Sequence, residues 1–195
     1  MLVESGKDIV GNAGQGLDSG YYGNVRWTDY SIPATQSKLG SLDKPDFDYV
    51  NLGLLFPQNN TAEQVSVIMQ MLHEKKLGNP IYLHIHYVQS VAVQPTFTVE
   101  YKFYNSNGTV IPATFTTINT SDLGGSKGIY TYTSGSILQY AQFPPIPAPA
   151  NEGLSANFEF RLYRNDDDVT GDVLLKFIDI HYEKNTAGSR ERFIK

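Results

Sequence analysis

The chain alternates bulky apolar and polar residues over most of its length, which is the two-residue period of a half-buried β-strand. The clearest case is "FTVEYKFY" at 97–104, where every second side chain is large and apolar. The segments "YLHIHYV", "ANFEFRLYR" and "VLLKFIDIHYE" show a similar pattern. Gly, Pro, Asn and Asp separate these segments, so the sequence predicts about eight short strands joined by turns.

Residues 61–77 fit two kinds of element. One set of apolar positions has helical spacing: Val65, Ile68, Met69 and Leu72. Another set alternates as on one face of a strand: Val65, Val67, Met69 and Met71. Periodicity alone leaves both open. Because the segments that follow are strands, we expect a strand here.

The predicted fold is all-β, a single antiparallel β-sandwich of jelly-roll type. No convincing helix interrupts the series of strands, which argues against parallel βαβ units. Strands with one apolar face bury that face when two sheets pack together. We place the domain at residues 25–184, with an extended glycine-rich N-terminal arm at 1–24 and a C-terminal tail at 185–195. The arm is too poor in apolar residues to fold alone, and we expect it to order on a partner.

Composition and charge exclude several functions. The chain has 195 residues, a net charge of -5 and no cysteine. Disulfides, zinc–thiolate sites and thiol nucleophiles are therefore excluded. The sequence has no basic stripe to neutralise a row of phosphates, and no apolar stretch near the ~20 residues of a membrane span. The first residues do not match an export signal. We expect synthesis in the cytoplasm, with no nucleic-acid or membrane partner.

Three of the histidines lie in two of the predicted strands. His84 and His86 share one face of the first strand, and Asp179 and His181 share one face of the second. If these faces are matched in one sheet, the four side chains converge as ligands suited to a first-row divalent metal. The alternative, which we favour on sequence alone, is that the imidazoles are hydrogen-bonding groups of the sheet and that Asp179 fixes the tautomer of His181. We therefore expect no bound metal and no cofactor.

Motifs for catalysis are missing from the sequence. No serine lies in a Gly-x-Ser-x-Gly elbow, and no glycine-rich loop is placed to bind phosphate. The acidic segment "NDDDVTGD" at 165–172 resembles a calcium loop only in part, because Phe177 stands where a bidentate glutamate is needed. We interpret it as a solvated hairpin loop. The sequence predicts a protein that is not an enzyme.

Three segments carry a resemblance to known proteins: "MLHEKKLGNPIYLHIHY", "FRLYRNDDDVTGD" and "DVLLKFIDIHYEKNTAGSRERFIK". They resemble a family of virion structural proteins of tailed bacteriophages, with a closing motif like D-x-H-Y followed by G-S-R-x-E-x-x-K. The resemblance extends over residues 35–195. The matching positions are His73, Gly78, His84, His86, Tyr87, Asp179, His181, Tyr182, Gly188, Ser189, Arg190 and Lys195. Leu72, Lys75 and Arg192 depart from the pattern.

The resemblance implies a structural role in a phage particle. Among such roles we expect a capsid decoration or cement protein that binds across subunits of the major capsid protein and stabilises the shell. The arm would extend along the joints between shell subunits. The tail would add a second contact, in which Arg190 and Arg192 meet shell acids while Phe193 and Ile194 fill a pocket. Analogy with jelly-roll cement proteins implies a homotrimer on the capsid surface of the virion.

Two alternatives remain open. In the first, the protein is a tail or head-fibre component that binds host glycan, with Tyr130, Tyr132 and Tyr140 as a stacking platform. In the second, it is a cupin-like metal-binding protein. That protein would use His84, His86 and His181, with Asp179 as the fourth ligand or its neighbour.

Overall fold

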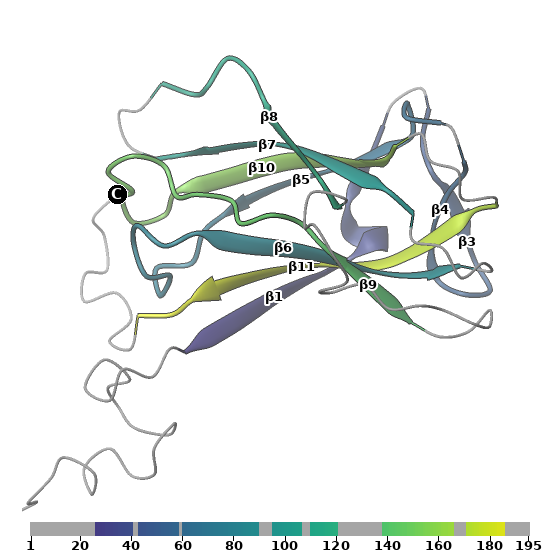
Figure 1. The fold of residues 1–195 in the computed structure, drawn as a ribbon, viewed down its shortest axis with the longest axis horizontal. Helices are drawn as coiled ribbons and strands as arrows, with labels where there is room; N and C mark the ends of the chain where they lie inside the picture. The colour runs from purple at the N-terminus through teal and green to yellow at the C-terminus, as the bar shows by residue number, and fades with distance from the viewer. Residues whose placement is uncertain are drawn as a thin grey trace, which may run out of the picture.

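The fold consists of two β-sheets packed face to face (Figure 1). A computed structural model describes residues 26–40, 43–58, 60–89, 95–106, 110–120, 138–165 and 171–185. The predicted N-terminal arm at 1–24 lies outside the described residues, and so does the C-terminal tail from residue 186 onward.

The two sheets contain eleven strands between them among the described residues. The first sheet, called sheet A, contains β1 (Trp27–Pro33), β3 (Asp46–Asp48), β4 (Gly53–Phe56), β6 (Ile81–Gln89), β9 (Gln139–Gln142) and β11 (Val173–Glu183). Sheet B contains β2 (Lys38–Leu39), β5 (Gln64–Gln70), β7 (Phe97–Tyr104), β8 (Thr116–Asn119) and β10 (Asn157–Arg164). One short 3-10 turn, η1 (Ala34–Gln36), links β1 to β2.

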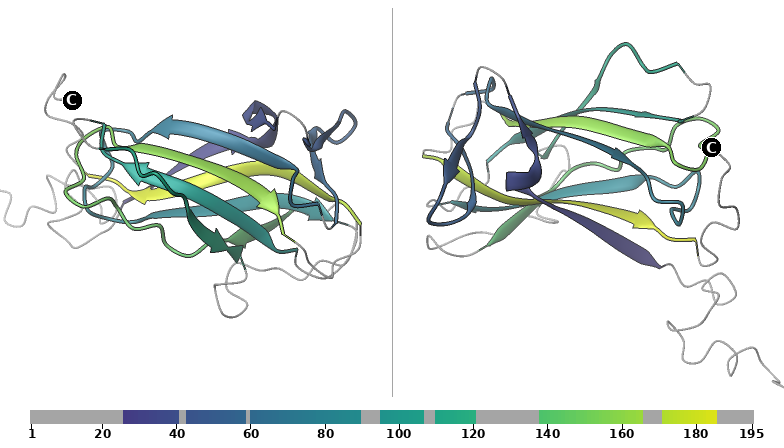
Figure 2. Two further views of the ribbon diagram at one scale, coloured as in Figure 1. Left: turned by 90° about the horizontal axis from the view of Figure 1, so that it is seen from above. Right: turned by 180° about the vertical axis from the view of Figure 1, so that it is seen from behind.

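The strand order is that of a jelly roll. Sheet A has the order β3-β4-β11-β6-β9, and β1 also pairs with β11 beyond the end of β4. Sheet B has the order β2-β5-β10-β7-β8. From β4 to β7 and again from β8 to β11, successive strands alternate between the two sheets, while β7 and β8 are neighbours in one sheet (Figure 2). All the pairs are antiparallel, which confirms the predicted all-β jelly-roll sandwich.

The core lies between the sheets and is built by the predicted alternation. Along β6, buried and partly exposed residues alternate at every position. Fully buried side chains of β6 and β11 meet those of β7 and β10; they are Leu83, Ile85, Tyr87, Ile178, Ile180, Tyr182, Phe97, Val99, Phe158 and Leu162. Burying these apolar faces stabilises the sandwich by about 25 cal/mol per Å² of area removed from water. The opposite faces of the same strands are turned toward solvent and can carry functional side chains.

The prediction of a strand within 61–77 is confirmed by β5. Val65 is fully buried, whereas Ile68 is 76% exposed. In a helix, residues three apart lie on the same side, but in a strand they point to opposite sides. The burial of Val65 and the exposure of Ile68 therefore match the strand pattern and not the helical one.

An ion pair between Lys75 and Glu152 fixes the loop after β5 against the loop before β10. Lys75 Nζ lies 2.8 Å from Glu152 Oε2, and both side chains are only 1% exposed. Lys75 Nζ also donates to the carbonyl of Asn79 at 2.7 Å. These bonds compensate the cost of burying the two charges. They order the loop that leads into β6, the central strand of the site described below.

No helix in the described part of the chain has the length and apolar character needed to cross a membrane.

Candidate functional site

Strand β6 forms the centre of the candidate site, because it lies between β11 and β9. His84 is opposite Asp179 of β11 on one side and Gln142 of β9 on the other. His86, two residues further along, is opposite Phe177 and Tyr140. The alternation along β6 therefore places both imidazoles in neighbouring rows of side chains on the outer face of sheet A.

Three polar side chains of these rows form a compact triangle. The Nε2 atoms of His84 and His86 are 3.0 Å apart. Asp179 Oδ2 lies 3.2 Å from His84 Nε2 and 2.8 Å from His86 Nε2. The strands that carry His84, His86 and Asp179 thus pair side by side, as convergence of these side chains requires. Among the described residues, these three are the group of His and carboxylate side chains that can hold a metal ion.

His181 lies beside the triangle and is not part of it. Its ring is stacked on that of His84, with centroids 4.4 Å apart and planes at 25°. Its Nδ1 is bonded to the carboxylate of Asp29 on β1. Burial and the neighbouring His84 lower the pKa of His181, and Asp29 and Asp179 oppose this shift. The predicted set of three imidazoles and one carboxylate is thus present as two imidazoles and a carboxylate, with the third imidazole stacked alongside.

Asp179 is held in its charged form. Burial by itself raises the pKa of the carboxyl group, but hydrogen bonds from His84, His86 and Ser31 outweigh burial and lower the pKa well below its usual value. The Asp179 carboxylate therefore carries its negative charge at neutral pH.

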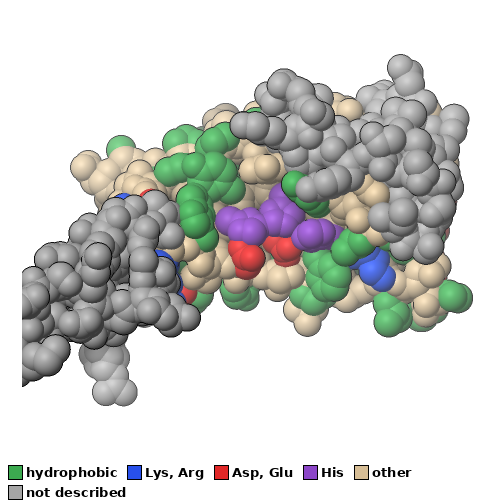
Figure 3. All heavy atoms as spheres, turned by 60° about the horizontal axis from the view of Figure 1, so that its bottom comes forward, with side chains coloured by type: hydrophobic (Ala, Val, Ile, Leu, Met, Phe, Trp, Pro, Cys, Tyr) green, Lys and Arg blue, Asp and Glu red, His purple; other side chains and the backbone are tan. Residues whose placement is uncertain are grey.

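Hydrophobic side chains lie beside the histidines and acidic groups on this face (Figure 3), and the aromatic residues that line the site are Trp27, Tyr82 and Tyr140. Trp27 of β1 packs edge-on against Tyr82 of β6, with ring centroids 5.3 Å apart. Trp27 nevertheless stays 52% exposed. On the other side, Tyr140 packs against His84 with centroids 5.8 Å apart. The result is a surface on which flat apolar rings and hydrogen-bonding groups stand side by side.

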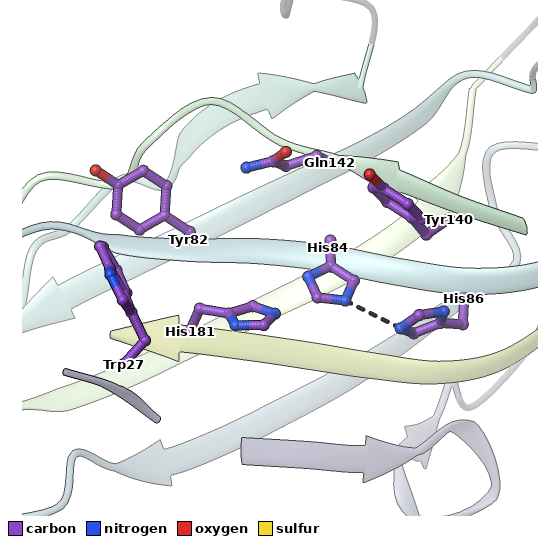
Figure 4. A pocket seen from close by; sticks show the side chains of 7 residues that line it. All are labelled: Trp27, Tyr82, His84, His86, Tyr140, Gln142 and His181. Atoms are coloured by element: carbon purple, nitrogen blue, oxygen red, sulfur yellow. Dashed lines mark hydrogen bonds between the residues drawn. The ribbon is translucent and has the colours of Figure 1, made fainter. Parts of the chain in front are cut away.

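These side chains line an open pocket of about 580 Å³ on the outer face of sheet A (Figure 4). Its lining residues are Trp27, Tyr82, His84, His86, Tyr140, Gln142 and His181. Its volume lies within the range of roughly 300–1,000 Å³ that small-molecule sites occupy. We refer to it below as the sheet A pocket.

Other predicted site residues lie elsewhere. His73 is bonded to the hydroxyl of Ser155 in the loop region after β5 and does not line the sheet A pocket. Tyr130 and Tyr132 of the predicted stacking platform lie outside the described residues, as does residue range 166–170 of the acidic loop. The predicted tail contacts, Arg190, Arg192, Phe193 and Ile194, also lie outside them.

Trp27, Tyr82 and Gln142 are site residues that were not predicted from the sequence. Tyr82 shares a strand face with His84 and His86, so alternation alone was a sufficient signal for it. Trp27 and Gln142 come from β1 and β9, and only the pairing of distant strands brings them to the pocket. No local pattern reports that pairing.

No protein-family model and no curated protein matches the chain. Among solved structures, it is similar to the CBM36-1 domain of a multidomain xylanase from the hindgut metagenome of Trinervitermes trinervoides, with a TM-score of 0.45 and 12% identity over 78% of this chain and 96% of that one. It is also similar to the carbohydrate-binding module CBM36 in complex with calcium and xylotriose, with a TM-score of 0.44 and 15% identity over 77% and 98% of the two chains. A third similar structure is CBM28, a carbohydrate-binding module specific for non-crystalline cellulose, with a TM-score of 0.37 and 14% identity over 80% and 88%. Likeness at this level says nothing about the ligand of this chain.

Proposed function

We propose that the protein is a non-enzymatic binding component of a phage particle that holds a saccharide in the sheet A pocket. The observation that carries this proposal is the position of Trp27, a half-exposed ring in a pocket that the Gln142 amide and the imidazoles also line. This is the second role considered from the sequence, the glycan-binding one.

The chemistry of the lining suits a sugar. The C–H faces of a pyranose ring are apolar and pack on aromatic rings, whereas its hydroxyl groups need donors and acceptors around the edge. Trp27, Tyr82 and Tyr140 supply aromatic surface. Gln142 offers both a donor and an acceptor, and the imidazoles add further polar groups. The lining is therefore amphipathic in the same way as the proposed ligand.

The placement of the lining on strands also suits binding. Tyr140 and Gln142 of β9 pair with β6, and Tyr82 of β6 pairs with His181 of β11, so their backbones are held before any ligand arrives. A site that is ordered in advance loses less conformational entropy on binding.

The particle setting of this proposal rests on the sequence resemblance to virion proteins. Capsid decoration is the alternative to a tail or fibre location within the particle, and the arm and tail residues on which it depends lie outside the described residues. The number of copies per particle separates these two locations. A decoration protein is present in hundreds of copies and a fibre or tail component in a handful, which quantitative mass spectrometry of purified particles measures.

Trp27 provides a direct test of saccharide binding, because it is the single tryptophan of the chain. The probes are O-antigen oligosaccharides purified from bacterial cell surfaces, with xylohexaose and cellohexaose as neutral comparisons. We expect at least one probe to change the Trp27 emission in a saturable manner and to protect the ring from acrylamide quenching.

Substitutions of pocket residues test whether the saccharide binds in the sheet A pocket. We expect Trp27→Ala and Gln142→Ala to lower affinity at least tenfold when binding is measured by calorimetry, which does not need the fluorophore. Phe115→Ala is the matched control, because Phe115 is a partly exposed aromatic that packs on Lys102 and Arg161 of sheet B. The proposal would be contradicted if Phe115→Ala weakened saccharide binding and Trp27→Ala left it unchanged.

A further inference from the structure

The geometry points to a metal site on the same face: we propose that His84, His86 and Asp179 bind one divalent first-row transition metal ion. The ion would sit between the three ligand atoms, on the side that faces the sheet A pocket. This inference does not depend on saccharide binding and has its own test.

The separations of the ligand atoms match those of a metal-bound set. A metal about 2.0–2.1 Å from each ligand, with angles of about 90–110°, places neighbouring ligand atoms about 2.8–3.4 Å apart. The three separations here are 3.0 Å between the two Nε2 atoms, and 3.2 and 2.8 Å from these to Asp179 Oδ2. The triangle therefore already has the size of one face of a coordination polyhedron.

Hydrogen bonds alone do not satisfy this triangle. An imidazole Nε2 either carries a proton or offers a lone pair in the ring plane, and it cannot do both. If His84 and His86 both donate to Asp179, their two N–H groups crowd each other across 3.0 Å. If one accepts from the other, its lone pair faces the charged oxygen of Asp179. Each arrangement of protons leaves one edge of the triangle repulsive, and a shared cation removes the repulsion on all three edges.

The angle at the carboxylate oxygen leads to the same conclusion. The triangle is almost equilateral, so the two nitrogens subtend only about 60° at Asp179 Oδ2, whereas two donors that share an oxygen normally spread along its separate lone-pair directions. Such close approach of the two imidazoles is normal when both bind one ion.

The ligands are held by regular structure. His84 is directly opposite Asp179 across the paired strands β6 and β11, and His86 follows two residues later on the same face. Their side chains are 15%, 13% and 25% exposed for His84, Asp179 and His86 respectively. The group is thus partly shielded from water but open toward the pocket, so an ion has an entry path and free coordination positions.

The donor set selects the kind of metal. Two imidazole nitrogens and one carboxylate oxygen suit Zn²⁺, Co²⁺, Ni²⁺ or Fe²⁺, whereas Ca²⁺ and Mg²⁺ prefer oxygen ligands throughout. The negative charge of Asp179 offsets part of the charge of the ion. His181 is not a ligand in this arrangement, because its ring is stacked on that of His84 and neither of its nitrogens belongs to the compact group of ligand atoms.

The test is a titration of the untagged full-length protein with Co²⁺ after removal of metals with a chelator, in the absence of saccharide. The visible ligand-field bands of Co²⁺ report coordination by protein, and Zn²⁺ displaces it from the same site. We expect saturation at one equivalent and loss of the bands on addition of Zn²⁺. His86→Gln and Asp179→Asn should each raise the Co²⁺ dissociation constant at least tenfold.

His73→Gln is the matched control, because it removes an imidazole that is bonded to Ser155 and not to the triangle. Its dissociation constant should stay within twofold of the unsubstituted protein. If Asp179→Asn does not fold, as judged by circular dichroism, His86→Gln decides, since His86 is the most exposed of the three ligands. The absence of ligand-field bands at millimolar Co²⁺ would overturn the proposal. It would also be overturned if His86→Gln and Asp179→Asn bound Co²⁺ as tightly as the unsubstituted protein. Neither result affects the saccharide test with Trp27.

Discussion

Val65 and Ile68 lie three residues apart in β5, yet Val65 is fully buried and Ile68 is 76% exposed. Their opposite environments follow from the strand conformation, which turns successive side chains to opposite faces of sheet B. Val65 packs in the core between the sheets, and Ile68 projects from the outer face. We therefore expect the two residues to make very different contributions to stability.

Truncation of these two side chains separates their roles. We expect Val65→Ala to lower the free energy of unfolding by about 1–3 kcal/mol, because it leaves a cavity in the core. Ile68→Ala should change it by no more than about 0.5 kcal/mol. Urea denaturation measures both values, and equal losses at the two positions would contradict the strand assignment.

The Lys75–Glu152 ion pair is predicted to be needed as a pair. Both side chains are almost completely buried, so removal of one charge leaves the other without compensation. We expect Glu152→Gln or Lys75→Met alone to destabilise the protein by about 3–5 kcal/mol. The double variant should be less destabilised than the sum of the two, and a double-mutant cycle in urea measures this coupling. Additive effects would contradict the prediction.

Metal binding is predicted to stabilise the fold by an amount that grows with the logarithm of the metal concentration above its dissociation constant. A ligand that binds the folded state alone adds about 2.7 kcal/mol of stability at one hundred times its dissociation constant. We expect Co²⁺ to raise the melting temperature accordingly, EDTA to reverse the rise, and His86→Gln to abolish it. His73→Gln should keep the full response.

Alkaline pH is predicted to destabilise the protein through Tyr87 and Tyr182. Burial raises the pKa of both hydroxyls above the usual value, and for Tyr182 the nearby Glu74 adds to the increase. The folded state therefore keeps these protons at pH values where the unfolded chain loses them. The stability that they contribute is complete below the unfolded pKa of about 10 and is lost as the pH rises beyond it.

The variant Tyr87→Phe isolates this effect. The Tyr87 hydroxyl is buried and has no hydrogen-bond partner within the described part of the chain. Its removal should leave stability at pH 7 unchanged or slightly higher and make the loss of stability above pH ~10 less steep. Tyr49→Phe is the control, because Tyr49 is 82% exposed. Denaturation curves from pH 7 to 11 give the comparison.

Much of the fold was predictable because its signals are local. The alternation in "YLHIHYV" and "FIDIHYE" assigns each side chain to a face of its strand without any knowledge of the neighbours. It put Leu83, Ile85 and Tyr87 on one face and His84 and His86 on the other, and the structure buries the first of these faces. The two-layered sandwich also follows from short strands that each need a second sheet to cover one apolar face.

The sequence predicted the site only on the condition that the strands carrying its residues pair with each other. The sequence placed two pairs of candidate ligands on two strand faces, but it did not show whether those faces would lie next to each other. The register of β6 and β11 decided that His84 faces Asp179 and that His181 faces Tyr82. A shift by one residue would have sent one set of side chains to the core.

The sequence by itself therefore determined which residues form strands and which face of each strand is apolar, since both depend on a period of two residues along the chain. Only the tertiary structure decided that Trp27, His84, Asp179 and Gln142 share one surface. The physical reason is that backbone hydrogen bonds between strands are nearly the same for every pair of residues. The choice of partner strand and register therefore comes from the packing of both sheets as a whole, which no single segment encodes.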